Sequence, residues 1–358
     1  KKIGSHAFEG CCRISGVLKI PKCITILRSH TFSECFRFTS LILHENLQHI
    51  NSYAFSGCFG FECELNIPNS LLSIGNNAFS NCSRFYGSLC ISDNVEMIGN
   101  YAFSGCIGLK GSLIIGNSLK IIDTYTFAGC SEFKGNLTIG QNIQRIEENA
   151  FCNFSKFHGE LKIPKSVTYI GESAFSGCYG FHGSLIIPDS ITEIKKYTFY
   201  RCTGFNNALK LGKSLRQIDD YAFAFCSELK GGLLIPESTE FIGKSSFYGC
   251  SDFKGLLKLP NSIEHVGEFA FYQCSGFSKL TISESITEIS NYTFANCTGL
   301  TGSLIIPDSV NYIGGFSFSG CYRFTGSLII PYVVQTIGEY AFSGCSGFTE
   351  LNINDSVI

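Results

Sequence analysis

Hydrophobic residues recur along this chain every 24 residues, with only two intervals of 23. Each repeat has an Ile, Leu or Val five residues before a Phe, a small residue directly before that Phe, and a Phe, Leu or Ile six residues after it. These columns predict stacked turns, because one turn of this length cannot bury its apolar side alone. The repeat Phe occurs fifteen times, at Phe8, Phe32, Phe55, Phe79, Phe103, Phe127, Phe151, Phe175, Phe199, Phe223, Phe247, Phe271, Phe294, Phe318 and Phe342.

A Leu-x-Ile or Leu-x-Leu triplet follows in each repeat and predicts a short β-strand, because it is aliphatic and often lies between Gly and Pro. The small residue before the Phe predicts close approach of two backbones. The stretch around the Phe predicts one short helical or 3₁₀ turn. A Gly two residues before the Leu predicts a positive φ at a bulge or tight corner, as at Gly111, Gly135, Gly183 and Gly302.

Composition narrows the class of protein. The 358 residues are 44% hydrophobic and only 16% charged, which excludes a disordered chain. With a net charge of −2, the chain has no overall positive charge of the kind that favours nucleic-acid binding. No signal peptide and no apolar run near 18 residues occurs, so we expect no membrane span within this fragment. Because the repeat register never breaks, we expect one continuous array over residues 1–358, without evident terminal caps.

Cysteine is abundant but regular. Fourteen of the nineteen cysteines lie three residues after the repeat Phe, which predicts a column of buried, reduced thiols. A disulfide framework would show paired and irregular spacings instead. No C-x-x-C pair occurs, and the stretch from His44 to His49 has one residue more than the H-E-x-x-H zinc motif. We therefore expect no metal site, no cofactor and no catalytic residues.

Three repeats are shorter and begin with F-x-x-L-x-L or F-x-x-L-x-I at Phe38, Phe277 and Phe348. This is the L-x-x-L-x-L core of a leucine-rich repeat with Phe as its first residue. With the recurring I-G-x-x-A-F-x-x-C segment, the whole chain closely resembles the BspA-like (Treponema-type) leucine-rich repeats of bacterial and protist surface proteins. The resemblance implies an α/β solenoid or horseshoe of about fifteen turns of 23–24 residues, with short parallel strands lining the concave side.

The middle residue of each Leu-x-Ile triplet is the candidate binding position, because in leucine-rich repeats it faces outward on the concave sheet. Aliphatic residues and Lys alternate there, and exposed apolar ridges are typical of interaction surfaces. The alternative is that these residues simply suit β-strands. The predicted ligand-binding strip consists of Ile114, Lys162, Ile186, Lys210, Leu234, Lys258, Ile305 and Ile329.

The sequence therefore predicts a non-enzymatic protein-interaction module. By the resemblance, it is a cell-surface or extracellular adhesion protein that binds protein ligands, such as host or extracellular-matrix proteins, through its concave face. The alternative is an intracellular, cytoplasmic repeat scaffold, which reduced cysteines would suit.

Overall fold

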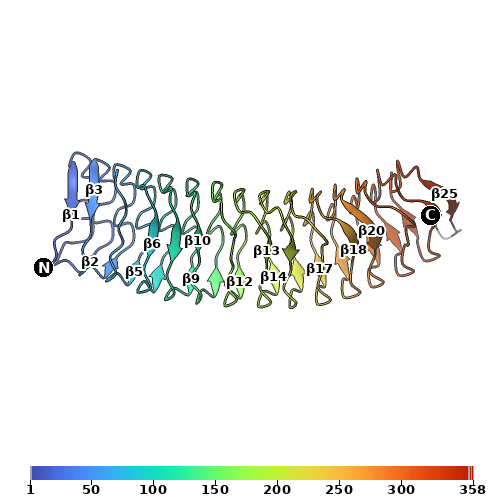
Figure 1. The fold of residues 1–358 in the computed structure, drawn as a ribbon, viewed down its shortest axis with the longest axis horizontal. Coiled ribbons are helices and arrows are strands. Elements are labelled where there is room, and N and C mark those ends of the chain that lie inside the picture. Colours follow the sequence, from blue (N-terminus) through green and yellow to red (C-terminus); the bar gives the residue numbers. More distant parts are fainter. Residues whose placement is uncertain (1, 354, 356, 358) are drawn as a thin grey trace. The chain divides into compact units, whose positions relative to one another are not determined.

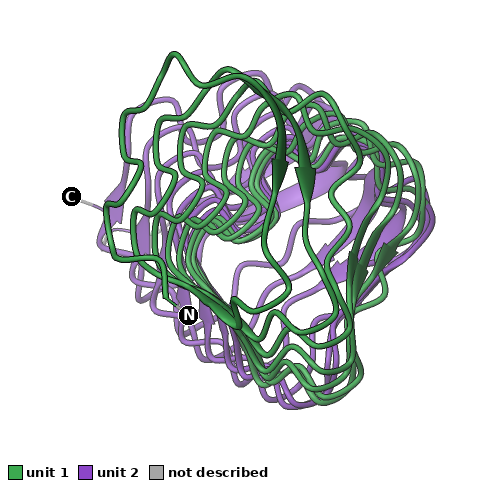
Figure 2. Cartoon of the chain, turned by 90° about the vertical axis from the view of Figure 1, so that its left-hand side faces the viewer, with its two compact units in different colours: residues 1–182 green, residues 183–358 purple. Residues whose placement is uncertain are grey.

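The chain folds into two compact units, residues 1–182 and residues 183–358 (Figure 2). The structure, a computed structural model, describes residues 2–353, 355 and 357. Each unit is a solenoid of parallel strands in which successive turns follow one another (Figure 1). The expectation of one continuous array over residues 1–358 stays a prediction.

One set of strands, called here the Ile strands, ends at the Ile, Leu or Val five residues before the repeat Phe. In unit 1 they form the parallel sheets β2-β4-β5-β7 and β9-β11-β12, and in unit 2 β14-β16-β17-β19 and β21-β22-β24. Their bounds are β2 Ile26–Leu27, β4 His49–Ile50, β5 Ser73–Ile74, β7 Met97–Ile98, β9 Ile121–Ile122, β11 Arg145–Ile146, β12 Tyr169–Ile170, β14 Glu193–Ile194, β16 Gln217–Ile218, β17 Phe241–Ile242, β19 His265–Val266, β21 Glu288–Ile289, β22 Tyr312–Ile313 and β24 Thr336–Ile337.

A second set, the Leu strands, contains residues of the Leu-x-Ile and Leu-x-Leu triplets, as predicted. The strand prediction fails in four repeats, because the triplets at residues 65–67, 161–163, 233–235 and 304–306 lie in no strand. The Leu strands also pair in parallel, as β1-β3 and β6-β8-β10 in unit 1 and as β13-β15, β18-β20 and β23-β25 in unit 2. Their bounds are β1 Gly16–Lys19, β3 Phe38–Ile42, β6 Leu89–Ile91, β8 Leu113–Ile115, β10 Leu137–Thr138, β13 Leu185–Ile186, β15 Leu209–Lys210, β18 Gly255–Lys258, β20 Phe277–Thr281, β23 Gly326–Ile329 and β25 Phe348–Asn352.

The α/β class predicted from the resemblance is wrong, because the described part of the chain contains no helix. Around each repeat Phe the backbone makes consecutive turns instead. The residues two before and two after the Phe have positive φ, for example 55° at Asn77 and 60° at Asn81 on either side of Phe79. Left-handed residues at this spacing interrupt a right-handed helix before it completes a turn.

The number of turns is also slightly lower than expected. The described residues contain seven Ile strands in each unit, which makes about fourteen turns rather than fifteen. Ile3, the equivalent residue of the first repeat, lies outside any strand.

The shorter repeats produce bulges where they pair with longer ones. The register shifts by one residue between Gly16 and Val17, between Gly255 and Leu256, and between Gly326 and Ser327. The three glycines have φ of 94°, 82° and 80°. The predicted bulge with positive φ is therefore confirmed at these pairs.

The same prediction fails at other glycines of this column. Gly183 and Gly302 have φ of 80° and 78°, as expected, but Gly111 and Gly135 do not have positive φ. A Cβ atom on Gly111 would lie 2.1 Å from Ser88 Oγ, and one on Gly135 would lie 2.3 Å from Ser112 Oγ. Close approach of the preceding turn, rather than φ, requires Gly at these two positions.

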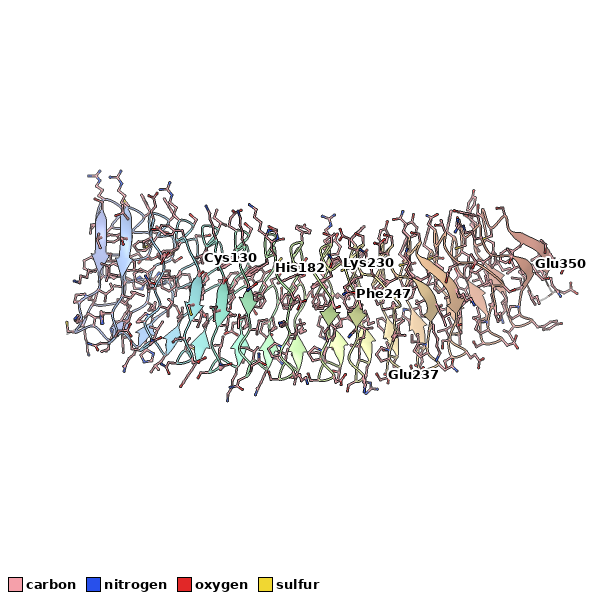
Figure 3. All side chains as sticks on the ribbon, in the orientation of Figure 1. Cys130, His182, Lys230, Glu237, Phe247 and Glu350 are labelled. Atoms are coloured by element: carbon pink, nitrogen blue, oxygen red, sulfur yellow. The ribbon has the colours of Figure 1, made fainter. Side chains whose placement is uncertain are left out.

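Stacked Phe rings fill the interior of each unit, where the side chains are densely packed (Figure 3). The Phe79 ring is fully buried, 5.3 Å from Phe55 and 5.4 Å from Phe103 between centroids. Its backbone N–H donates to the carbonyl of Ala102, at 2.8 Å. The small residue before the Phe therefore does lie where two backbones approach closely, as predicted.

The cysteine column joins successive turns. All nineteen cysteines are free, and the thiol of Cys82, for example, donates to the carbonyl oxygen of Phe55 at 3.1 Å. Burial raises the pKa of the Cys58 thiol to about 12, so the group stays protonated and can act as this donor. Phe154 replaces Cys in one turn, where its ring stacks on Phe157 at 5.1 Å.

We predict a stabilising substitution at Ser246, in the column directly before the repeat Phe. Ser246, directly before Phe247, is fully buried and its hydroxyl has no hydrogen-bond partner, whereas Thr198 at the same position donates to Lys195 O at 2.8 Å. We expect Ser246→Ala to raise the free energy of unfolding by up to about 1 kcal/mol, because an unpaired polar group leaves the interior. Urea denaturation measures the change. Thr198→Ala, which removes a satisfied hydroxyl, should lower stability; a destabilised Ser246→Ala variant would contradict the argument.

Candidate functional site

The structure exposes every side chain of the predicted strip. In unit 1, Ile114 and Lys162 are exposed. In unit 2 the apolar members are prominent, with Leu234 81% and Ile305 76% exposed. The outward orientation predicted for these positions is therefore confirmed, and their part in ligand binding stays a prediction. The other exposed members in unit 2 are Ile186, Lys210, Lys258 and Ile329.

The strand register orders these side chains within unit 2. Ile186 of β13 lies opposite Lys210 of β15 in the parallel pair, so the two are neighbours about 4.8 Å apart along the sheet. Lys258 Nζ lies 2.8 Å from Oε1 of Glu237, which is labelled in Figure 3 at the lower edge of the view. Both groups are exposed, and such pairs contribute at most about 1 kcal/mol. Lys258 can therefore leave its ion pair with Glu237 and bind a carboxylate of a protein partner at little cost in free energy.

Two of the surface grooves in unit 1 are lined by outward side chains of the strands. One, of about 570 Å³, is lined by the outward residues Cys90, Ile114 and Thr138 of three neighbouring Leu strands. The other, of about 650 Å³, lies on the Ile strands and includes the exposed side chains of Met97 and Ile121. The sequence does not reveal the second groove, because the outward residues of the Ile strands, such as Met97 and Ile121, belong to a column with no predominant residue type.

Asp123 lines the second groove together with Glu96 and Lys120. Burial raises the pKa of the Asp123 carboxyl above its usual value, and the nearby Glu147 carboxylate adds to this effect. The groove thus combines the apolar side chains of Met97 and Ile121 with polar and charged groups, a combination typical of ligand-binding pockets.

A column of aromatic side chains occupies the positive-φ position two residues before the repeat Phe. In unit 2, Phe269, Tyr292, Phe316 and Tyr340 stack in sequence, with centroids 4.5, 4.6 and 4.7 Å apart. Each ring face within the stack is covered by the next ring, so mainly ring edges reach the surface. Tyr101 and Tyr125 of unit 1 stack in the same way, at 4.7 Å.

The first two members of this column in unit 1 are histidines. The rings of His6 and His30 stack 4.5 Å apart, and His30 also stacks on Tyr53 at 4.6 Å. The Glu9 carboxylate bridges the pair, with Oε2 2.6 Å from His6 Nδ1 and Oε1 3.2 Å from His30 Nδ1. The hydrogen bond with His6, more than any other interaction, lowers the pKa of the Glu9 carboxyl.

Sequence reasoning missed this cluster. The available signal was the spacing: His6 and His30 are one repeat apart in one column, and Glu9 follows His6 by three residues. By contrast, neither His44 nor His49 belongs to a group of three candidate metal ligands among the described residues, and His49 Nδ1 lies 2.8 Å from Ser73 Oγ.

No helix in the described residues has the length and apolar character needed to cross a membrane. Comparison with solved structures finds the chain similar to a leucine-rich repeat protein from Bacteroides ovatus ATCC 8483. Identity is 26% and the TM-score 0.56, over 99% of this chain and 76% of that one.

Two further solved structures are similar over most of the chain. A leucine rich cell surface protein from Faecalibacterium prausnitzii A2-165 is 21% identical, with a TM-score of 0.46, over 97% of this chain and 81% of that one. The pneumococcal vaccine antigen PcpA is 18% identical, with a TM-score of 0.39, over 96% of this chain and 79% of that one.

No curated protein sequence matches the chain. The family described as the BspA type leucine rich repeat region, in contrast, matches it over residues 1–134, 134–254, 232–349 and 322–358. These matches extend over the entire length, and they agree with the F-x-x-L-x-L and I-G-x-x-A-F-x-x-C patterns in the sequence. The chain therefore belongs to the BspA-type leucine-rich repeat family.

Proposed function

We propose that this protein is a non-enzymatic binding module that holds protein ligands on the outward middle residues of its Leu-x-Ile and Leu-x-Leu triplets. Leucine-rich repeat proteins are in general protein-interaction scaffolds. The observation that carries the proposal is the exposure of large apolar side chains in unit 2, above all Leu234 and Ile305, in a column that also holds Lys210 and Lys258.

The composition of this column suits a protein partner of mixed character. Exposed aliphatic side chains offer apolar area whose burial is favourable by about 25 cal/mol per Å². The interspersed lysines give fixed positive points that steer and orient an acidic partner. In unit 1 the groove beside Ile114 adds a concave surface to the same strand column.

We further propose that the module acts at the cell surface and binds host or extracellular-matrix proteins, as its resemblance to BspA-like surface proteins implies. The competing proposal is a cytoplasmic scaffold, which the nineteen free thiols favour, because reducing compartments keep cysteines unpaired.

Binding to a panel of immobilised extracellular-matrix proteins, followed by biolayer interferometry, tests both the surface and the class of partner. The double variant Ile186→Asp and Leu234→Asp should weaken binding at least about 100-fold, because central apolar contacts dominate interface energies and two buried carboxylates oppose them. Its circular dichroism spectrum should not change, since both side chains are exposed. If no matrix protein binds the unmodified chain, the cytoplasmic alternative is favoured.

A matched control removes exposed aromatic area from the same unit but outside the strip. Tyr322→Asp with Tyr332→Asp should leave binding within about twofold, because neither residue is the middle residue of a Leu-x-Ile or Leu-x-Leu triplet. Unaltered binding by the folded Ile186→Asp, Leu234→Asp variant would contradict the proposed strip and direct attention to the stacked Tyr column.

A further inference from the structure

We propose that His6, Glu9 and His30 bind one divalent transition-metal ion, with Zn²⁺ as the reference ion, between the first two turns of unit 1. The donor atoms of the three side chains lie within 4.8 Å of one another, and they form the only such group of three among the described residues. This site is separate from the surface proposed above for protein ligands.

The backbone presents the two histidines to a common point. Both residues have positive φ, 60° at His6 and 57° at His30, and occupy the same position of adjacent turns. Hydrogen bonds from His6 N to Ser29 O, at 3.0 Å, and from Phe8 N to Thr31 O, at 2.9 Å, hold those turns together. The two imidazoles are therefore positioned by the parallel turns rather than by a flexible loop.

The donor set selects the class of ion. Two imidazole nitrogens with one carboxylate suit Zn²⁺, Co²⁺, Ni²⁺ or Cu²⁺, whereas Ca²⁺ and Mg²⁺ prefer sites made of oxygen atoms alone. Three protein ligands leave at least one position of the ion open to water, because all three side chains are partly exposed.

Ion binding requires a defined rearrangement. The His6 and His30 rings are nearly parallel, with 10° between their planes, so both in-plane lone pairs cannot point at one ion as they stand. His30 is held between His6 and Tyr53, while the His6 side chain is 56% exposed. We infer that His6 turns out of the stack and that the ion takes the place between Nδ1 and the carboxylate. Each imidazole then binds through its Nδ1 lone pair with its own proton on Nε2, and only the additional proton of an imidazolium is released to solvent.

Spacing supports this rearrangement. In a tetrahedral site with bonds of about 2.0–2.1 Å, neighbouring donor atoms are about 3.4 Å apart. Glu9 Oε2 lies 2.6 Å from His6 Nδ1, and Glu9 Oε1 lies 3.2 Å from His30 Nδ1. Each of these oxygen–nitrogen distances therefore needs to grow by less than one bond length. The exposed side chains of His6 and Glu9 have room for this movement.

The site is tested by titrating the full chain with Co²⁺ and then with Zn²⁺. The protein carries no polyhistidine tag, and bound metal is removed first. We expect one equivalent of Co²⁺ to give visible d–d bands without the near-ultraviolet thiolate-to-cobalt band, and Zn²⁺ to displace it. Metal binding should also slow amide exchange at His6 and Phe8, whose N–H groups link the two turns.

Three substitutions separate this site from other metal-binding groups. His6→Ala, Glu9→Gln and His30→Tyr should each weaken Co²⁺ binding at least about tenfold, the loss that even outer-shell partners cause. His30→Tyr keeps an aromatic ring in the stack, because Tyr53 already occupies the next position of the column. His265→Tyr, which replaces a histidine stacked on Phe241 in unit 2, should leave binding unchanged.

Equal affinity in the three folded variants would overturn the proposal, as would an absence of bound Co²⁺. A dominant thiolate-to-cobalt band would also overturn it, since it would assign the metal to cysteines such as the nearby Cys11 and Cys12. Thermal melting of each variant identifies any that fails to fold; His30→Tyr, which preserves the stack, then decides the result.

Discussion

Replacing Phe79 by Ala is expected to lower the free energy of unfolding of unit 1 by about 3–5 kcal/mol. The Phe79 side chain is fully buried, with Phe55 and Phe103 stacked on its two faces and Phe85 edge-on at 6.2 Å between centroids. Alanine would remove all three contacts. The flanking turns cannot collapse into the space, because backbone hydrogen bonds such as that from Phe79 N to Ala102 O, at 2.8 Å, fix their spacing.

Urea denaturation gives the magnitude, and amide hydrogen exchange shows where the loss occurs. In a solenoid each turn contacts mainly its neighbours, so protection should fall most in the turns around residue 79. Phe8→Ala is the matched control: Phe8 belongs to the same column but is 38% exposed, and it stacks on one ring, Phe32. A Phe79→Ala effect no larger than that of Phe8→Ala would contradict the proposed role of the stack.

Raising the pH from 8 to 10 is expected to destabilise unit 1 by about 5–6 kcal/mol through its buried thiols. Burial raises the pKa of Cys58 and of Cys130 to about 12, and raises those of Cys82 and Cys106 well above the ordinary value of 9.0. The unfolded chain ionises its thiols above pH 9, whereas the folded chain keeps them protonated. Stability is therefore complete below pH 9 and falls until the folded pKa is reached, by about 1.4 kcal/mol for each thiol at pH 10.

Denaturant titrations at pH 7, 8, 9 and 10 measure this loss. In the variant Cys82→Ala, residue 82 cannot ionise. Its free energy of unfolding should therefore fall by about 1.4 kcal/mol less between pH 8 and pH 10 than that of the unmodified protein. Thiol counting provides an independent check: native protein should expose few reactive groups, and denatured, unreduced protein most of the nineteen. A denatured protein without reactive thiols would mean an oxidised column and would remove the basis of the pH effect.

The sequence predicted the features that depend on one residue type repeated in register. The buried Phe column, the Leu strands, the outward strip and the buried cysteines all follow from which side of a turn each residue occupies. Thr239 is an example: the other repeats have Ile, Leu or Val at its position. Thr239 is nevertheless fully buried, and its hydroxyl donates to Leu215 O at 3.0 Å. The column predicts the burial, and a single hydrogen bond makes the polar residue acceptable.

What the sequence did not reveal depends on backbone dihedrals and on contacts between turns. Residues at positive φ replace the expected helical turn, and most of those two residues before the Phe are Tyr, Phe or Ser, which do not signal a left-handed conformation as Gly does. Gly111 and Gly135 look like φ-dependent glycines but are required by side chains one turn away. The His6–Glu9–His30 cluster was also not predicted from the sequence, because its members come from two different turns.

The bulges at β1-β3, β18-β20 and β23-β25 have a consequence for how the chain finds its neighbours during folding. In an array of equal repeats, a strand that pairs one repeat too early or too late loses almost nothing, so slipped or exchanged pairings compete with the native one. A short repeat beside a long one ends that equivalence, because the pair has to absorb the missing residue in a bulge, which in the native pairing forms at a positive-φ Gly. The three short repeats thus act as position markers: within each unit, they distinguish one turn from its otherwise interchangeable copies.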